Sequence, residues 1–343
     1  MATAKRIISN ISNQKLKNST ISAINFLHEQ TKYLEENQIY CGDSKGLLKK
    51  IKPNSIALSI WSPPYHVGKS YEQEQTYEEW LELLEIVIFN HFNILKPGGF
   101  LAINIGDILC FKDSEMPKIQ ANNVSMRKCS VTEEDVKKAQ EVNPNFNRRQ
   151  LAKLLNCSEQ TIHRRQFGNN IRGGKYETQT RVKIVGGLIE GFALNAGLYL
   201  YDRRIWSKDP SWANSHWTTN SYRAVDEFEY LYIFWKPGET IIDRNRLTKE
   251  EWTQWGSRGI WQIRSVQNNN NHESKFPVEL PLRAIKLFTN KDDIILDCFI
   301  GSGATALAAL QAERNFIGID IRTESVDLAN KQIEEYKSMF YKL

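Results

Sequence analysis

The chain has 343 residues, of which 41% are hydrophobic and 25% are charged, and its formal net charge is +5. This composition is typical of a soluble globular protein with one large domain or two smaller ones, and the charge is compatible with a polyanionic partner. The five cysteines contain no C-x-x-C pair and no apolar run reaches about 18 residues, so neither a disulfide framework, a zinc or other metal site, nor a membrane-spanning helix is expected.

The chain begins with a polar segment, residues 1–35, whose few apolar residues recur at helical spacing and predict a peripheral helix. The first residues do not lead into the apolar core of a signal peptide, so we expect a cytoplasmic protein with reduced thiols. Residues 39–43 predict a short strand that ends in a Gly-Asp turn. Residues 55–61 predict a buried strand, because Pro63 and Pro64 stop an apolar run there.

A helix and another strand follow this turn. Residues 77–95 carry apolar side chains at helical spacing and end before Pro97-Gly98-Gly99, and residues 100–105 predict the strand. The order strand, helix, strand predicts a parallel sheet with covered faces. From residue 111 to residue 175 the apolar pattern disappears and Lys, Arg, Asn and Gln dominate, so we interpret this segment as an insertion.

The apolar pattern resumes after the insertion. A polar stretch, residues 240–275, separates the predicted strand at 228–235 from the predicted helix at 281–289. Three tryptophans are interspersed in it, and residues 267–271 form a loop. No internal repeat is present. The predicted elements, in order, are a helix at 183–196, strands at 198–206 and 228–235, a helix at 281–289, a strand at 293–299, a helix at 304–312, a strand at 316–320 and a helix at 324–341.

A glycine-rich loop joins the strand that ends at Asp297 to the helix that begins at Ala304. Its glycines, Gly301 and Gly303, allow the backbone to turn sharply and to approach a ligand closely. Asp320 ends the next strand, at about the 20-residue separation expected of a ribose-binding carboxylate. A plain strand-to-helix turn is the alternative, but the combination of strand, glycine loop, helix, second strand and terminal acid favours a nucleoside site. The lack of a third glycine argues against a dinucleotide site.

Ser62-Pro63-Pro64-Tyr65 forms a rigid turn after the buried strand. The prolines fix two φ angles and remove two N–H donors, so the Pro63 carbonyl is free to accept, and the Ser62 hydroxyl is a second acceptor. An exocyclic amine is a poor nucleophile because its lone pair is conjugated into the ring. Two acceptors on its hydrogens favour a pyramidal nitrogen that can attack a methyl sulfonium, while Tyr65 offers a face for base stacking. The alternative is a strand-ending turn with a packed tyrosine.

These residues resemble the N4-cytosine and N6-adenine DNA amino-methyltransferases, whose catalytic tetrapeptide is (Asp/Asn/Ser)-Pro-Pro-(Tyr/Phe/Trp). The family's cofactor motif Asp-x-Phe-x-Gly-x-Gly is matched by residues 297–303, with departures at Cys298, Ile300 and, just beyond it, Ala304. Residues 275–281 resemble the motif that holds the methionine end of the cofactor. The likeness covers residues 39–329 apart from the insertion. The order, with the catalytic motif first, corresponds to the permuted β arrangement.

The resemblance implies an α/β fold, a permuted Rossmann-like sheet that uses S-adenosyl-L-methionine, with a helical DNA-recognition insertion. A C5-cytosine mechanism is disfavoured, since it needs a Pro-Cys nucleophile and no cysteine here follows a proline. The catalytic residues implied are Ser62, Pro63, Pro64 and Tyr65. The cofactor-binding residues implied are Asp43, Phe276, Pro277, Asp297, Phe299, Gly301, Ser302, Gly303 and Asp320.

Residues 148–165 resemble a helix-turn-helix. Leu151, Leu154 and Leu155 predict one apolar stripe, Ser158 can cap the second helix and Ile162 can pack back onto the first. A small solvated helical pair is the alternative. A second aromatic and basic stretch contains the three tryptophans of residues 240–275. Two roles are equally supported for it: lining the cleft near the target base, or packing a small subdomain. The DNA-binding candidates are Arg148, Arg149, Gln160, Thr161, His163, Arg164, Arg165 and Arg258.

We therefore predict transfer of a methyl group to N4 of a cytosine flipped out of double-stranded DNA. The nearest alternative is N6 of adenine on the same scaffold; a helix-turn-helix regulator and a nicotinamide oxidoreductase are more remote. The family implies a restriction–modification system with a cognate endonuclease. The predicted segments are an N-terminal helical segment (1–35), a catalytic half (36–112), the DNA-recognition insertion (113–175), the rest of the catalytic half (176–245), a loop region near the target base (246–274) and a cofactor-binding half (275–343).

Overall fold

The computed structural model describes residues 33–64, 76–112, 119–121, 129–167, 176–178, 180–211, 226–266 and 277–340. The chain divides into two compact units. The larger unit contains Met1–Ile108, Ile184–Pro210 and Glu227–Leu343, and the smaller contains Leu109–Lys183 and Ser211–Asp226. The sequence predicted a different division, with an insertion at residues 113–175, and that division stays a prediction.

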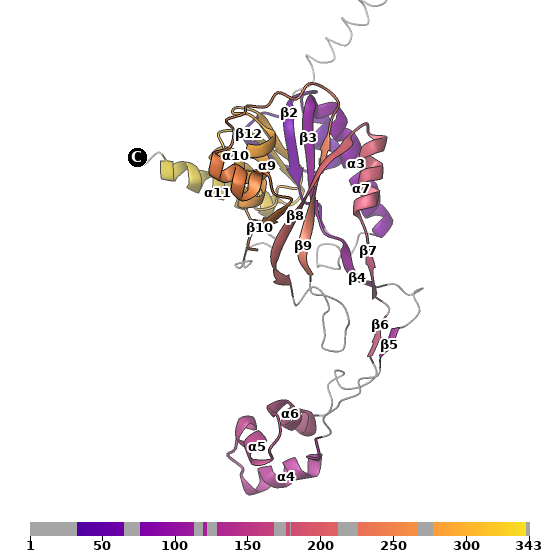
Figure 1. Cartoon of the computed structure of the whole chain (residues 1–343), viewed down its shortest axis with the longest axis vertical. Helices are drawn as coiled ribbons and strands as arrows, with labels where there is room; N and C mark the ends of the chain where they lie inside the picture. Colours follow the sequence, from indigo (N-terminus) through magenta and orange to yellow (C-terminus); the bar gives the residue numbers. More distant parts are fainter. Residues whose placement is uncertain are drawn as a thin grey trace, which may run out of the picture. The chain divides into compact units, whose positions relative to one another are not determined.

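An eight-stranded sheet forms the centre of the larger unit, with the order β1-β12-β11-β2-β3-β9-β8-β10 (Figure 1). The first five strands in this order are parallel, β9 is antiparallel to β3, and β10 is parallel to β8. The predicted α/β class is therefore confirmed. The strands are β1 (Gln38–Cys41), β2 (Ile56–Trp61), β3 (Leu95–Ile105), β8 (Tyr199–Ser211), β9 (Asp226–Trp235), β10 (Ile260–Gln262), β11 (Ile294–Asp297) and β12 (Asn315–Asp320).

Helices cover the sheet: Figure 1 shows α3 and α7 on one side of the strands and α9 and α10 on the other. Every residue of β2 is buried, as expected of a central parallel strand with both faces covered. The helices and helical turns are α2 (Ser44–Leu47), η1 (Leu48–Lys50), α3 (Tyr77–Ile94), α7 (Gly186–Asn195), α8 (Lys249–Glu251), η4 (Trp252–Gly256), α9 (Glu279–Phe288), α10 (Ala304–Gln311) and α11 (Thr323–Phe340).

The main hydrophobic core lies between one face of the sheet and the helices α9 and α10. It takes alternate residues of β2 and β3, such as Leu58, Ile60 and Ala102, because successive side chains of a strand point to opposite faces. In the described ranges, none of the helices combines the length and apolar composition that a membrane span requires.

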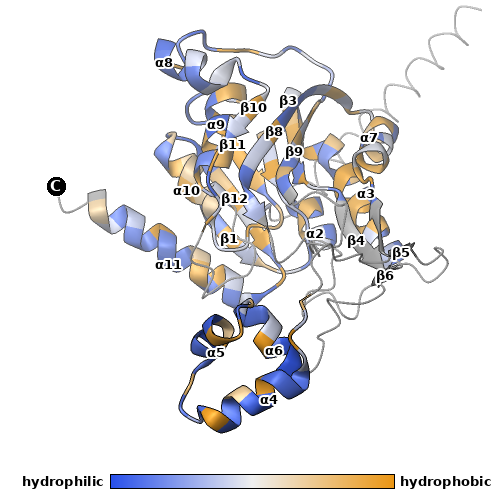
Figure 2. Cartoon of the chain, turned by 60° about the horizontal axis from the view of Figure 1, so that its bottom comes forward, coloured by the Kyte–Doolittle hydropathy of each residue, from blue (hydrophilic) through white to orange (hydrophobic). Residues whose placement is uncertain are grey.

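The smaller unit holds three short helices with a core of their own. These are α4 (Glu133–Val142), α5 (Arg148–Leu154) and α6 (Glu159–Phe167), and Figure 2 shows α4 as largely hydrophilic. Val136, Leu151, Ala152 and Ile162 form the core. The strand pairs β4 (Ile108–Lys112) with β7 (Thr180–Lys183) and β5 (Ile119–Ala121) with β6 (Tyr176–Thr178) form two small sheets.

The element boundaries differ from the sequence predictions at two instructive places. Pro97-Gly98-Gly99 was expected to lie between helix and strand, whereas β3 already begins at Leu95 and contains it. Gly98 has φ 79°, and a Cβ there would lie 2.0 Å from the Glu239 carbonyl oxygen, so the glycine is needed for this close approach. The polar stretch 240–275 contains β10, an edge strand of three residues that is too short to leave a periodic pattern.

Candidate active site

The predicted functional segments leave the sheet at the carboxyl ends of four neighbouring strands. Gly42-Asp43 follows β1, Ser62 follows β2, the glycine loop follows β11, and Asp320 ends β12. Along the chain β2 leads to β3 on one side, while β11 leads to β12 on the other, so the β11/β2 neighbours form a topological switch point. Open α/β sheets bind ligands at the carboxyl ends of strands at such a point.

The turn after β2 is held against helix α3. The Pro64 carbonyl accepts a hydrogen bond of 2.6 Å from the indole Nε1 of Trp80, while Pro63 is buried and Ser62 is half-buried. No hydrogen bond within the described part of the chain engages the Ser62 hydroxyl or the Pro63 carbonyl, so both are available as acceptors. Tyr65, the last residue of the tetrapeptide, lies outside the described residues.

A buried polar network lies beneath this turn. The Nε2 atom of His91, on α3, is 2.8 Å from the Ser59 hydroxyl and accepts a hydrogen bond of 3.3 Å from the indole N–H of Trp61. Because an indole N–H only donates, Nε2 carries the lone pair and Nδ1–H donates to the Val87 carbonyl at 2.7 Å. Burial lowers the pKa of His91 to about 4, which keeps the ring neutral. The sequence reading missed His91, which stands among the apolar residues of a helix.

The loop after β11 is tied together by the Asp297 carboxylate. One oxygen accepts a hydrogen bond of 2.5 Å from the Thr305 hydroxyl, and the other accepts one of 3.0 Å from the Phe299 amide. Asp297 is completely buried, and this burial raises its pKa to about 7. Gly301 and Gly303 have φ 50° and 92°, values that strongly favour glycine.

Further hydrogen bonds connect this loop to the ends of β12 and β1. The Asp320 carboxylate accepts from the Gly301 amide at 2.9 Å and from the Arg322 amide at 3.0 Å. The Ser44 hydroxyl donates to the Cys298 carbonyl at 2.5 Å, and Asp43 caps α2 by accepting from the Lys45 amide. The described cofactor candidates at these strand ends are therefore neighbours, and several serve as braces of the loops.

Two candidates stand apart from that group. Pro277 precedes α9, where its carbonyl accepts a hydrogen bond of 3.1 Å from the Leu280 amide. Phe276 lies outside the described residues. The end of β2 and the glycine loop do meet, because the ring of Trp61, the last residue of β2, makes an edge contact with the ring of Phe299, with centroids 5.4 Å apart.

The predicted helix-turn-helix lies in the smaller unit. Asn156, at φ 46°, forms the turn, and the Ser158 hydroxyl caps α6 by accepting from the Thr161 amide at 3.1 Å. Leu154 is 53% exposed, so the prediction of a three-leucine stripe was wrong: α5 ends at this residue and Ala152 takes its place in the core. The Nε atom of Arg165 donates to the Val131 carbonyl at 2.9 Å, which ties part of this side chain to the module.

The other DNA-binding candidates of this module differ in exposure. Arg148, Arg149 and Gln160 are exposed, while Thr161, His163 and Arg164 are half-buried. The His163 ring lies against Phe167, with centroids 5.0 Å apart. These positions leave the first three side chains the most accessible to a partner.

The aromatic and basic stretch is largely a packing element. Trp255 and Trp261 are buried and pack edge to face, with ring centroids 6.0 Å apart, and the Trp261 indole donates to the Trp255 carbonyl. Trp252 is 50% exposed. For the two buried tryptophans, packing is therefore the role that the structure supports.

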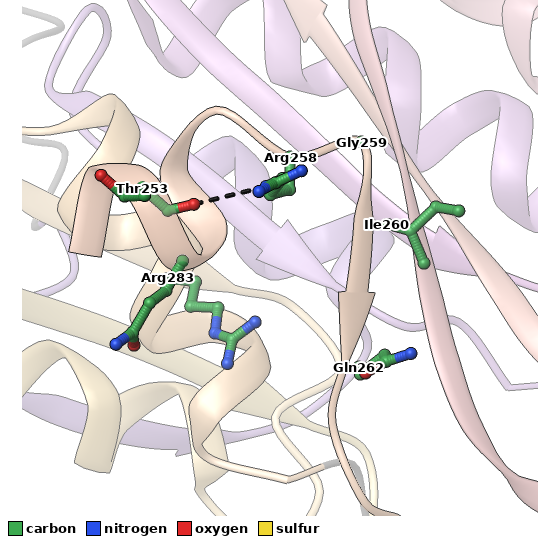
Figure 3. Close-up of a pocket in the computed structure, with 7 residues that line it drawn as sticks. Thr253, Arg258, Gly259, Ile260, Gln262 and Arg283 are labelled. Atoms are coloured by element: carbon green, nitrogen blue, oxygen red, sulfur yellow. Dashed lines mark hydrogen bonds between the residues drawn. The ribbon is translucent and has the colours of Figure 1, made fainter. Parts of the chain in front are cut away.

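A cavity of about 710 Å³ adjoins these tryptophans (Figure 3). Arg258 lines it and donates to the Thr253 carbonyl at 3.3 Å; Arg283 enters from α9, with its guanidinium 5.5 Å from the Trp255 ring centroid. None of the lining residues is acidic. The sequence analysis missed Arg283, whose only local signal was its i,i+4 spacing from Glu279, a residue that stands two positions before the predicted helix at 281–289. The remaining lining residues are Gln254, Gly259, Ile260 and Gln262.

A family model described as DNA methylase, of the N6/N4 methyltransferase type, matches residues 56–331. The type II methyltransferase M.BglI of Bacillus subtilis is 60% identical over 304 residues, which cover 89% of this chain and 87% of that protein. M.BglII, also of Bacillus subtilis, is 24% identical over 310 residues, covering 85% and 68%.

Two solved structures share the fold. One is a candidate DNA modification methylase of Thermus thermophilus in complex with S-adenosyl-L-methionine, with a TM-score of 0.56 and 22% identity over 86% of this chain and 92% of that one. The other is the cytosine-N4-specific PvuII DNA methyltransferase, with a TM-score of 0.52 and 18% identity over 87% and 86%. With the family model and the 60% identical relative, the conclusion is that the chain belongs to the N4-cytosine/N6-adenine family of DNA amino-methyltransferases.

Proposed function

We propose that the protein is a type II DNA methyltransferase that transfers the methyl group of S-adenosyl-L-methionine to the exocyclic N4 of a flipped cytosine. The observation that carries this proposal is the placement of the Ser62-Pro63-Pro64 turn and the glycine loop at the β11/β2 switch point, where Trp61, the residue just before the turn, contacts Phe299 of the loop. The 60% identity to a type II methyltransferase supports the restriction–modification role and a cognate endonuclease.

The strand ends fit the proposed cofactor. Gly301 and Gly303 have positive φ values that permit the sharp turn of the loop, and a Cβ on Gly303 would lie 2.9 Å from the Cβ of Ala329 on α11. The Asp320 carboxylate stands where a ribose-binding acid is expected. Asp43, Phe299 and Ser302 would complete the nucleoside site, and Phe276 and Pro277 the methionine end. When bound, the cofactor supplies an electrophilic methyl group on a sulfonium.

The catalytic turn would prepare the amine for attack. The Ser62 hydroxyl and the Pro63 carbonyl each accept one amine hydrogen, which pulls the nitrogen out of conjugation and frees its lone pair. Pro64 is anchored by Trp80, so these acceptors are held in place before the base arrives. Tyr65 would stack on the base. No separate general base is required if the amine proton leaves after transfer.

The choice of cytosine rests on Ser62, since serine at the first catalytic position is commoner in the cytosine branch of the family. Adenine N6 is the alternative on the same scaffold. Modification-sensitive single-molecule sequencing of DNA from a methylation-free host that expresses the protein distinguishes them. We expect N4-methylcytosine at one short recurring sequence. N6-methyladenine there would overturn the base assignment, and unmodified DNA would overturn the proposed activity in favour of a DNA-binding regulator.

DNA contacts are proposed on both compact units. The exposed Arg148, Arg149 and Gln160 of the helix-turn-helix, with Thr161, His163, Arg164 and the terminal amino groups of Arg165, suit phosphates and base edges. In the larger unit, Arg258 and Arg283 line a cavity whose described lining residues include no acidic one, which suits a backbone phosphate, while Arg283 also pairs with Glu279 at 2.8 Å.

We expect Arg258→Gln and Arg283→Gln each to weaken DNA binding about equally for specific and unrelated duplexes. Each substitution should reduce the slope of log affinity against log salt by about 1, because one phosphate contact is lost. Fluorescence anisotropy over a salt series measures both effects. Lys291→Gln is the matched control: Lys291 lies just before β11, which four strands of the sheet separate from β10, and pairs with Glu313. A slope unchanged in both arginine variants would contradict the prediction.

A further inference from the structure

Asn104, on β3, stands beside the catalytic turn. The register of the parallel pair β2/β3 places Trp61 opposite Ile103, so the next residues, Ser62 and Asn104, are neighbours. Ile60 and Ala102, two residues earlier on each strand, both belong to the main core, so alternation puts Ser62 and Asn104 on that same face of the sheet. Adjacent strands lie about 4.8 Å apart, a separation that a hydroxyl and a carboxamide can bridge.

The side-chain oxygen of Asn104 is buried without a hydrogen-bond partner in the part of the chain that the structure describes. The residue is 1% exposed, and its Nδ2 donates to the Tyr230 carbonyl of β9 at 3.2 Å. Rotating the amide by 180° would set its oxygen against that carbonyl, so the unpaired group is an acceptor. An orphaned buried acceptor is uncommon in native proteins and calls for an explanation.

Ser62 has the complementary requirement. To accept a hydrogen from the target amine, its hydroxyl must direct a lone pair at the amine and donate its own hydrogen elsewhere. Within the described residues, the Ser62 hydroxyl donates to no partner, and the Asn104 oxygen is an unused acceptor on the neighbouring position.

We propose that the Asn104 side-chain carbonyl accepts the Ser62 hydroxyl hydrogen in the complex with the target base, and thereby directs the Ser62 lone pair at the amine. This inference rests on the proposed methyl transfer and makes Asn104 a positioning residue that acts through Ser62. It differs from a purely structural role, in which Asn104 only ties β3 to β9 through Tyr230.

A set of variants separates the two roles. Asn104→Leu keeps the side-chain size and removes the acceptor; it is made in the wild-type chain and in the Ser62→Ala and Ser62→Asp variants. In the Ser62→Asp variant the carboxylate accepts hydrogen bonds and has no hydroxyl hydrogen that needs an acceptor, so its turnover should not depend on Asn104. We expect Asn104→Leu to lower kcat about 10- to 100-fold in the wild-type chain, and less than about twofold in either Ser62 variant, with KM for DNA and cofactor affinity within about threefold.

The controls make each failure distinct. Asn90→Leu removes a half-buried amide on α3 whose nitrogen is also buried without a partner among the described residues, and should leave kcat unchanged. Asn104→Ala repeats the test if thermal melting shows that the leucine variant does not fold. The inference is overturned if Asn104→Leu lowers kcat by the same factor in all three backgrounds, or if it does not lower kcat in the wild-type chain. If the wild-type chain transfers no methyl group to any duplex, it is the proposed function that fails, and the inference with it.

Discussion

Ser62→Ala is expected to lower kcat for methyl transfer by about 10²- to 10³-fold while cofactor affinity stays within about threefold. The substitution removes one of two acceptors for the amine hydrogens, and this interaction matters most when the nitrogen becomes pyramidal. Ser62 follows a fully buried strand, so the loss of one hydroxyl leaves the fold in place. Single-turnover transfer to a cognate duplex measures the effect on kcat, and calorimetry measures cofactor binding.

Ser55→Ala is the matched control for this result. Ser55 precedes the same strand at its opposite end, where its hydroxyl donates to the Lys52 carbonyl at 2.7 Å. It should leave kcat within about twofold of the wild type. The Ser62→Ala, Tyr65→Ala double variant removes acceptor and stacking face together, so retained turnover in that protein would refute the catalytic assignment.

The elements around the site could be predicted from the sequence because their signals are local. An apolar run stopped by two prolines, and a run that leads into Gly301-Ser302-Gly303, each specify a strand and the loop that follows it. The order of the strands could not be read in this way. β1 pairs with β12 across almost the whole length of the chain, and only tertiary packing selects that neighbour.

Side-chain roles were harder to predict than positions. Asp297 and Asp320 were expected to contact the cofactor, and the structure shows both accepting hydrogen bonds from backbone amides of the glycine loop, Asp297 from Phe299 and Asp320 from Gly301. A sequence does not reveal whether a carboxylate is already engaged by backbone amides. Asn104 and His91 were missed for the opposite reason, since each polar residue stands within an apolar stretch whose pattern defines a core element.

His91 and Asp297 are buried ionisable groups that should make the free energy of unfolding depend on pH in opposite directions. Burial lowers the pKa of His91 from 6.5 to about 4, so between these values the unfolded chain binds a proton that the folded chain does not. The free energy of unfolding should therefore rise with pH across that window, by up to about 3 kcal/mol at about 1.4 kcal/mol per unit of pKa shift. Burial raises the pKa of Asp297 from 3.8 to about 7, so its contribution falls as pH rises across that range.

The two contributions partly cancel in the wild-type chain, and single substitutions should separate them. His91→Gln keeps an acceptor for the Trp61 indole and a donor for the Val87 carbonyl but no longer titrates, so its unfolding free energy should fall more steeply as pH rises. Asp297→Asn keeps an acceptor for the Phe299 amide, and its unfolding free energy should instead rise with pH. Urea unfolding at intervals between about pH 4 and about pH 8 measures both slopes. Parallel profiles for the two variants would show that neither group titrates as its burial requires, because the opposite slopes follow directly from a lowered pKa of His91 and a raised pKa of Asp297.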